Sequence, residues 1–211
     1  MRRSREERLL ELTQTIDLPL WNAGVVFAGI DEAGRGPLVG NVVAGCCVMP
    51  PSPLIPWVDD SKKLSEKRRE EVYEEIIHTA LYWNVGEATP EEIDRLNILN
   101  ATRLAMRRAA EGIPASLFLI DAVKNVGLAG EERPIIHGDA LSYSIAAASI
   151  LAKVHRDREM AALDEMYPEY GFASNKGYGT AKHIEALKQF GPCRAHRVTF
   201  IGHFTDREAE R

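Results

Sequence analysis

A short apolar run near the N-terminus ends in two adjacent acids and constrains the fold more than any other feature of the chain. Residues 25–30 are almost wholly apolar, Asp31 and Glu32 follow them, and a Gly-Arg-Gly turn follows the acids. Such a run predicts a buried strand with the two carboxylates at its C-terminal end. A desolvated carboxylate loses far more hydration free energy than apolar neighbours return, so the pair needs a neutralising cation. The sequence therefore predicts a divalent metal at the end of this strand.

The rest of the chain alternates strand-like and helix-like segments, which indicates an α/β domain with a mixed sheet. At 211 residues the chain is long enough for one domain with a sizeable core plus a small appendage. We expect an N-terminal helical extension over residues 1–22, in which Pro19 separates a helix from the first strand. A single domain is expected over residues 23–211, and it includes a helical C-terminal segment from about residue 167. The expected strands cover residues 25–31, 40–49, 81–86, 115–121 and 133–137, and the expected helices cover residues 5–15, 66–80, 90–110, 141–166 and 181–190, with a tail after the last helix.

Composition indicates a cytoplasmic protein without a membrane segment. No apolar run approaches the roughly 20 residues that cross a bilayer, and no signal-peptide core follows the charged N-terminus. Three cysteines, of which Cys46 and Cys47 are adjacent, make a poor disulfide framework. We expect a monomer.

The net charge of −5 argues by itself against a nucleic-acid partner, because phosphates favour basic surfaces. Basic residues are nevertheless clustered at residues 62–63, 67–69 and 194–197, with Lys176 and Lys182 between the last two groups. The distribution of charge is therefore compatible with a basic groove on an acidic protein.

Several segments end in acids that a sheet could bring together. If the strands that end at Asp31 and Asp121 are parallel neighbours, their carboxylates meet at one edge of the sheet, where open α/β sheets bind ligands. Oxygen ligands without a His or Cys pattern favour Mg²⁺ or Mn²⁺, and four acids could hold two such ions. Each acid alone could instead be a loop residue, and Asp139 a helix cap. Adjacent strand residues point to opposite faces, so Asp31 and Glu32 share a centre only if the strand ends there, as Gly34 allows.

Two glycine-containing segments are typical of loops that approach a ligand closely. Residues 34–36 could be a plain tight turn, but glycine backbone can also contact a ligand, and Arg35 supplies planar donors for a phosphate. Tyr178 lies between two glycines, where its ring either stacks on a sugar or base or packs in a turn before a helix. Residues 60–64 are either a solvated helix entry or a phosphate clamp. The candidate substrate-binding residues are Gly34, Arg35, Gly36, Lys62, Lys63, Lys176 and Tyr178, with His183 and His196 close to them.

Together these motifs resemble ribonuclease HII, the type 2 ribonuclease H. The resemblance covers about residues 25–200, and its motifs are residues 29–37, 60–64, 119–121, 138–139, 145–157 and 176–180, in that order. It implies a ribonuclease H-like fold, a central mixed sheet flanked by helices, with a helical C-terminal part that closes over the substrate. It also implies that Asp31, Glu32, Asp121 and Asp139 are catalytic and bind two Mg²⁺ or Mn²⁺ ions, that residues 34–36 sense the ribose 2′-OH, and that Tyr178 senses the junction with DNA.

The activity that the resemblance implies is two-metal hydrolysis of the RNA strand of RNA–DNA hybrids, together with cutting on the 5′ side of a single ribonucleotide in duplex DNA. The products would carry 3′-OH and 5′-phosphate ends. Two departures from the family pattern are His137, where a lysine is expected, and Ala122, where a glycine often follows the third acid. The alternatives are a metal-dependent DNA nuclease or strand-transfer enzyme of the same superfamily, and a hybrid-binding module without catalysis. The sequence identifies no replication or repair partner.

Overall fold

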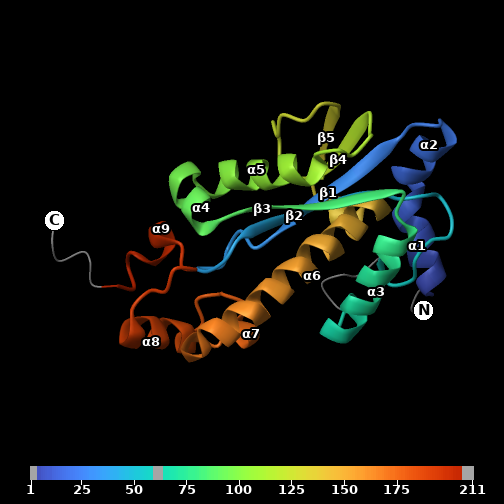
Figure 1. Cartoon of the computed structure of the whole chain (residues 1–211). Coiled ribbons are helices and arrows are strands. Elements are labelled where there is room, and N and C mark those ends of the chain that lie inside the picture. The colour runs from blue at the N-terminus through green and yellow to red at the C-terminus, as the bar shows by residue number, and fades with distance from the viewer. Residues whose placement is uncertain (1–3, 59–63, 206–211) are drawn as a thin grey trace.

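A mixed five-stranded sheet forms the centre of the protein, as the alternation of segments predicts (Figure 1). The computed structural model describes residues 4–58 and 64–205. The strand order is β3-β2-β1-β4-β5, with parallel pairing between β1 and β4 and between β4 and β5, and antiparallel pairing elsewhere. The strands are β1 (Phe27–Ala33), β2 (Val42–Val48), β3 (Tyr82–Ala88), β4 (Leu117–Asp121) and β5 (Glu131–Ile135).

Helices cover both faces of this sheet (Figure 1). The long α6 (Tyr143–Met166) crosses one face, with α1 (Arg5–Gln14) and α3 (Glu66–Thr79) packed beside it, and α5 (Ile98–Ala110) covers the other face. Each face therefore has its own apolar core, and the two cores account for the continuous burial of β1 and β2. Among the helices in the described part of the chain, none combines the length and apolar composition that crossing a bilayer requires.

Two strand glycines allow α6 to lie unusually close to the sheet. A Cβ atom on residue 29 would lie 2.2 Å from the carbonyl carbon of Ser144, and one on residue 45 would lie 2.4 Å from the Ala148 oxygen. Such distances are closer than side chains tolerate, so glycine is required at both positions. This close packing brings the first two turns of α6 against β1, where the strand reaches Asp31.

The N-terminal segment differs from the prediction at Pro19. Instead of separating helix from strand, Pro19 lies in the first turn of a second helix, α2 (Asp17–Asn22). Proline has no backbone N–H, and this costs nothing there because the N–H groups of the first turn have no acceptor within the helix. The buried Asp17 carboxylate accepts the N–H groups of Tyr143 and Ser144 at 3.0 and 2.9 Å, and so caps α6 from outside. The division of the chain at residue 22 stays a prediction.

The helix predicted over residues 90–110 is two helices. α4 (Pro90–Leu96) and α5 are separated by Asn97, whose φ of 67° ends the first helix and whose side chain accepts the Asn100 N–H at 3.1 Å to begin the second. An apolar stripe alone does not reveal such a break, because α4 and α5 both direct their apolar residues to the same face of the sheet.

The C-terminal part is helical, as predicted, and packs against the far end of α6 (Figure 1). Its helical pieces are η3 (Pro168–Tyr170), α7 (Phe172–Asn175), α8 (Ala181–Phe190) and α9 (Val198–Ile201). A further short helix, η2 (Gly138–Ala140), precedes α6 at its other end. The last of the C-terminal pieces, α9, lies in the tail expected after the last predicted helix. Its first two N–H groups are accepted by Asp94 of α4 at 2.8 and 2.9 Å, a long-range contact that no local pattern indicates.

Candidate active site

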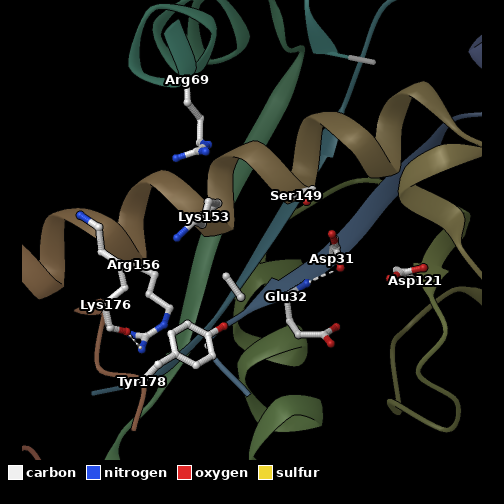
Figure 2. Close-up of a pocket in the computed structure, with 11 residues that line it drawn as sticks. Asp31, Glu32, Arg69, Asp121, Ser149, Lys153, Arg156, Lys176 and Tyr178 are labelled. Atoms are coloured by element: carbon white, nitrogen blue, oxygen red, sulfur yellow. Dashed lines mark hydrogen bonds between the residues drawn. The ribbon is translucent and has the colours of Figure 1, made fainter. Parts of the chain in front are cut away.

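The carboxylates of Asp31 and Asp121 lie at the same edge of the sheet, as predicted from the strand pattern. β1 and β4 are parallel neighbours, and their ladder ends at Ile30 opposite Ile120, so Asp31 and Asp121 are the next residues of the two strands after the paired segment. A cavity of about 400 Å³ opens beside them (Figure 2). It is lined by Asp31, Glu32, Ala33, Gly34, Arg69, Asp121, Ser149, Lys153, Arg156, Lys176 and Tyr178.

Asp31 is the most enclosed of the acids, with 4% of its surface exposed. Its Oδ1 accepts the backbone N–H of Glu32 at 2.7 Å, and its carboxyl group also bonds to Ser149 of α6. Burial raises the pKa of Asp31 well above its usual range, and the nearby charges of Glu32 and Asp121 raise it further. The site therefore holds more negative charge than its own hydrogen bonds neutralise.

Glu32 departs from the expected geometry, because β1 does not end there. The strand continues to Ala33, which pairs with Val43 of β2, so the side chains of Asp31 and Glu32 leave the backbone on opposite sides. Figure 2 shows them diverging from the strand. Glu32 Oε1 lies 3.2 Å from Arg35, while the buried Oε2 has no hydrogen-bond partner in the described part of the protein. Burial raises the pKa of Glu32, and Arg35 partly offsets that increase.

Asp139 lies beyond the cavity lining, although its backbone is close to the other acids. It sits in η2, and the N–H of the preceding Gly138 donates to Asp121 Oδ1 at 2.7 Å. Within residues 4–58 and 64–205, no three acidic, His or Cys side chains converge into a ready-made metal cage. The structure thus brings three predicted acids to one cavity and leaves Asp139 outside its lining, in the turn that the Gly138 N–H joins to Asp121.

The acids nevertheless fit a divalent cation. Three carboxylates with excess negative charge face one cavity, and an enclosed carboxylate oxygen of Glu32 has no protein donor among the described residues. Burial without a donor is costly for a carboxylate unless a cation supplies the missing interaction. Oxygen-only donors are the ligands that Mg²⁺ and Mn²⁺ prefer.

The other end of the cavity is basic. Lys176 was predicted as a substrate contact, whereas Arg69 was predicted only as part of the basic cluster at residues 67–69. Arg69, Lys153 and Arg156 lie there as well, opposite the acids in Figure 2. Two of these could have been found from sequence, because residues 153 and 156 follow Ser149 at helical spacing along α6. Arg69 comes from α3 and is held 3.3 Å from Asp157, so only the packing of α3 on α6 brings it to the site.

The predicted loop residues lie around the cavity mouth. Gly34, with a φ of 90°, lines the cavity, and a Cβ on residue 36 would lie 3.6 Å from the ring of Tyr178. Tyr178 is 51% exposed, so its ring is available to a ligand. Lys176 Nζ lies 3.3 Å from Glu66 at the start of α3. Lys62 and Lys63 lie outside the described residues.

Three C-terminal residues are less accessible than the sequence suggested. Arg197, expected in a basic surface cluster, is fully buried, and the rings of His183 and His196 are buried too. His183 Nδ1 bonds to the Tyr178 carbonyl oxygen at 2.9 Å, which confirms that it lies near a candidate contact. Because these three side chains are buried, they cannot contact a nucleic acid directly. They lie in the core behind the residues that line the cavity mouth.

The sheet order, the crossing helix and the acids at the ends of β1 and β4 define an α/β protein of the ribonuclease H-like class. Ribonuclease H2 from Pyrococcus horikoshii OT3 is similar, with a TM-score of 0.72 and 27% identity over 88% of this chain and 99% of that chain. A structure of Bst-RNase HIII in complex with Mn²⁺ shares the fold, with a TM-score of 0.68 and 17% identity over 83% of this chain and 67% of that one.

The chain belongs to the ribonuclease HII family, because the family model for ribonuclease HII matches residues 28–203. Ribonuclease HII of Desulfitobacterium hafniense (strain DSM 10664 / DCB-2) is 54% identical over 184 residues, which cover 86% of this chain and 71% of the relative. The predicted fold and the predicted enzyme class are thereby confirmed. The protein is a ribonuclease, a hydrolase that cleaves the RNA strand of RNA–DNA hybrids.

Proposed function

We propose that this ribonuclease, besides cleaving hybrids, cuts duplex DNA on the 5′ side of a single embedded ribonucleotide by a two-metal mechanism that leaves 3′-OH and 5′-phosphate ends. The observation that carries the proposal is the cavity, in which three carboxylates lie next to a glycine turn and an exposed tyrosine. Acids of this kind suit phosphodiester hydrolysis, and the adjoining turn and ring suit recognition of one sugar.

Asp31, Glu32, Asp121 and Asp139 are the proposed ligands of two Mg²⁺ or Mn²⁺ ions. When bound, the ions would supply an activated water and stabilise the charge on the departing 3′-oxygen. The protein's own contribution is to hold the ligands: the Glu32 N–H and Ser149 orient Asp31, and the Gly138 N–H orients Asp121. That last hydrogen bond also keeps η2, and with it Asp139, against the end of β4.

Ribose recognition is proposed for residues 34–36. The 2′-OH is the one group that distinguishes RNA from DNA at a given position, and it both donates and accepts hydrogen bonds. Backbone groups of a glycine turn reach such a hydroxyl without steric hindrance. Tyr178, whose ring would lie 3.6 Å from a Cβ on residue 36, would stack on the sugar of the neighbouring deoxynucleotide.

The basic end of the cavity would bind phosphates of the duplex. Arg69, Lys153 and Lys176 each already lie near an acid, so their charges are partly neutralised before substrate binds. Lys62 and Lys63 are proposed as further phosphate contacts on sequence grounds. We also infer a cytoplasmic protein, because Cys46, Cys47 and Cys193 are free thiols, as expected in a reducing compartment. A monomer is proposed on sequence grounds.

The test is cleavage of a duplex that carries one ribonucleotide, with and without Mg²⁺, with the nick mapped to the nucleotide. A single nick on the 5′ side of the ribonucleotide, abolished by a chelator and restored by Mg²⁺ or Mn²⁺, is expected. An all-DNA duplex and a continuous hybrid are the controls. Cutting of the all-DNA duplex would favour the DNA nuclease alternative, and cutting of the hybrid alone would overturn the embedded-ribonucleotide activity.

A further inference from the structure

The Arg197 guanidinium group lies beneath the loop of residues 34–41 and uses every one of its donors there. Its relative exposure is 0%. Nε donates to the Gly40 oxygen, Nη1 to those of Arg35 and Pro37, and Nη2 to those of Gly34 and Asn41, at distances of 2.6–3.1 Å. A guanidinium has five N–H groups, so each one serves a different carbonyl of the same loop.

Five carbonyl oxygens that converge on one point repel one another unless a cation lies among them. Gly34 and Gly40 have φ values of 90° and 80°, which side chains rarely adopt, and their carbonyls are among the five. The shape of the loop and the presence of the guanidinium are therefore coupled. Lysine carries the same charge but has three donors on a flexible stem, so it cannot reproduce this planar array.

The segment that carries Arg197 is itself fixed to the loop. The Arg197 N–H donates to the Leu38 oxygen and the Gly40 N–H donates to the Ala195 oxygen, each at 2.9 Å. On the other side, Asp94 accepts the N–H groups of the two residues that follow Arg197. The guanidinium is thus a rigid support, held from both sides, for the turn at the mouth of the cavity.

We propose that Arg197 is a positioning residue for ribose recognition, which orients the peptide groups of residues 34–36 toward the 2′-OH of the substrate. The proposal rests on the proposed function, because it assigns the ribose contact to this turn. Arg197 itself touches no substrate, since it is fully buried under the loop. Loss of the guanidinium group would release the carbonyl groups of residues 34 and 35, so that the turn would distinguish a 2′-OH from another 2′ substituent less well.

The first test compares wild type with Arg197→Lys on two duplexes that differ only in one 2′ substituent, a ribonucleotide or a 2′-fluoro nucleotide. Single-turnover rates per folded molecule are measured in Mg²⁺. We expect the rate on the ribonucleotide to fall about 10- to 100-fold and the rate on the 2′-fluoro substrate to fall less than about threefold. A matched control is Arg107→Lys, because Arg107 also donates to a backbone carbonyl, that of Val126, away from this cavity. Equal losses on both substrates would make Arg197 a merely structural residue.

The second test measures the conformation of the loop by limited proteolysis and needs no activity assay. Trypsin cleaves after Arg35, which is exposed at the tip of the turn, so we expect faster cleavage between residues 35 and 36 in Arg197→Ala than in wild type. Guanidinium ion at about 25 mM should refill the vacated position and restore protection and ribose discrimination together. Unchanged cleavage in the variant, or rescue of neither property, would overturn the proposal.

If the Arg197 variants do not fold, Asp94→Ala is measured instead, because it loosens the support of Arg197 without removing the guanidinium. The same selective loss on the ribonucleotide, by about threefold or more, is then expected, and no change in the ratio of the two rates would contradict the proposal. Failure of wild-type protein to nick the single-ribonucleotide duplex would instead overturn the proposed function itself.

Discussion

Gly138 donates its backbone N–H to Asp121 Oδ1 over 2.7 Å, so the carboxylate that ends β4 holds the turn that carries Asp139. A Cβ on residue 138 would lie 3.3 Å from that same oxygen and 2.6 Å from Ile145 Cδ1, so a larger residue there would displace the end of the Ile145 side chain. Asp121 therefore has two roles, because it faces the cavity and also positions a second acid.

Asp121→Asn separates these two roles. Asparagine keeps an oxygen that accepts the Gly138 N–H but removes the negative charge, so we expect the fold to persist and the rate of hybrid cleavage to fall at least about 100-fold. Activity in Mg²⁺ and the thermal midpoint are measured together. Glu165→Gln, which removes an exposed acid at the end of α6, is the control and should leave both unchanged. Wild-type activity in the Asp121 variant would contradict the site.

Tyr178→Ala is expected to weaken nicking at a single ribonucleotide about tenfold and to affect continuous hybrids less, because only the former presents a ribose–deoxyribose junction to the ring. Stacking of one ring on a nucleotide contributes about 1–3 kcal/mol. Tyr82, on the edge strand β3, is 50% exposed against 51% for Tyr178, so Tyr82→Ala is a matched control for loss of an exposed ring. Equal losses on the two substrates would count against the junction role.

Asp17→Ala is expected to destabilise the protein by about 2–3 kcal/mol without changing activity per folded molecule. The substitution leaves the N–H groups of Tyr143 and Ser144 buried and unpaired, at about 1–3 kcal/mol for each group, while it also removes the cost of burying a carboxylate. Urea denaturation measures the change. Gln14→Ala, at an exposed position of α1, serves as control, and a change below about 0.5 kcal/mol in the Asp17 variant would contradict the capping role.

A chain of hydrogen bonds through two buried histidines predicts a specific pH dependence of stability. His183 Nδ1 must donate to the Tyr178 oxygen, so its Nε2 accepts from His196 Nε2 at 3.1 Å, and His196 Nδ1 accepts the Cys193 N–H at 3.0 Å. Both rings are therefore neutral in the folded protein. Burial lowers the pKa of His183, and burial together with the nearby His183 lowers the pKa of His196 to about 4.

Because the folded pKa of His196 is lowered, the unfolded chain binds more protons between about pH 6.5 and 4. The stabilisation is complete above about pH 6.5 and is lost as the pH falls toward 4, by about 2 kcal/mol at pH 5. We expect the stability difference between wild type and His196→Gln to shrink by about that amount between pH 7.5 and pH 5 in urea titrations. His78→Gln, on the exposed surface of α3, is the control. A difference that does not vary with pH would contradict the neutral pair.

Much of the fold follows from local patterns. The apolar runs at β1 and β4, the caps Ser65 and Thr89, and the long stripe of small residues on α6 each predict an element within two or three residues of where it lies. Helix entries are the most predictable points, because one side chain satisfies the first N–H groups locally. The break at Asn97 and the helix that contains Pro19 were not predicted. The same apolar pattern is compatible with a continuous or a broken helix, so it does not reveal the backbone conformation at these residues.

The sequence by itself determined that the apolar runs of β1 and β4 end at acids and that a glycine turn follows one of them, because strand patterns are local. It also indicated that the acids would meet if the two strands were parallel neighbours, which share an edge of the sheet. Only the tertiary structure decided which side chains complete the site. Arg69 reaches the cavity through the packing of α3 on α6, and Arg197 lies under a loop more than 150 residues earlier in the chain. Contacts across such separations depend on how whole elements pack, and no local pattern encodes that.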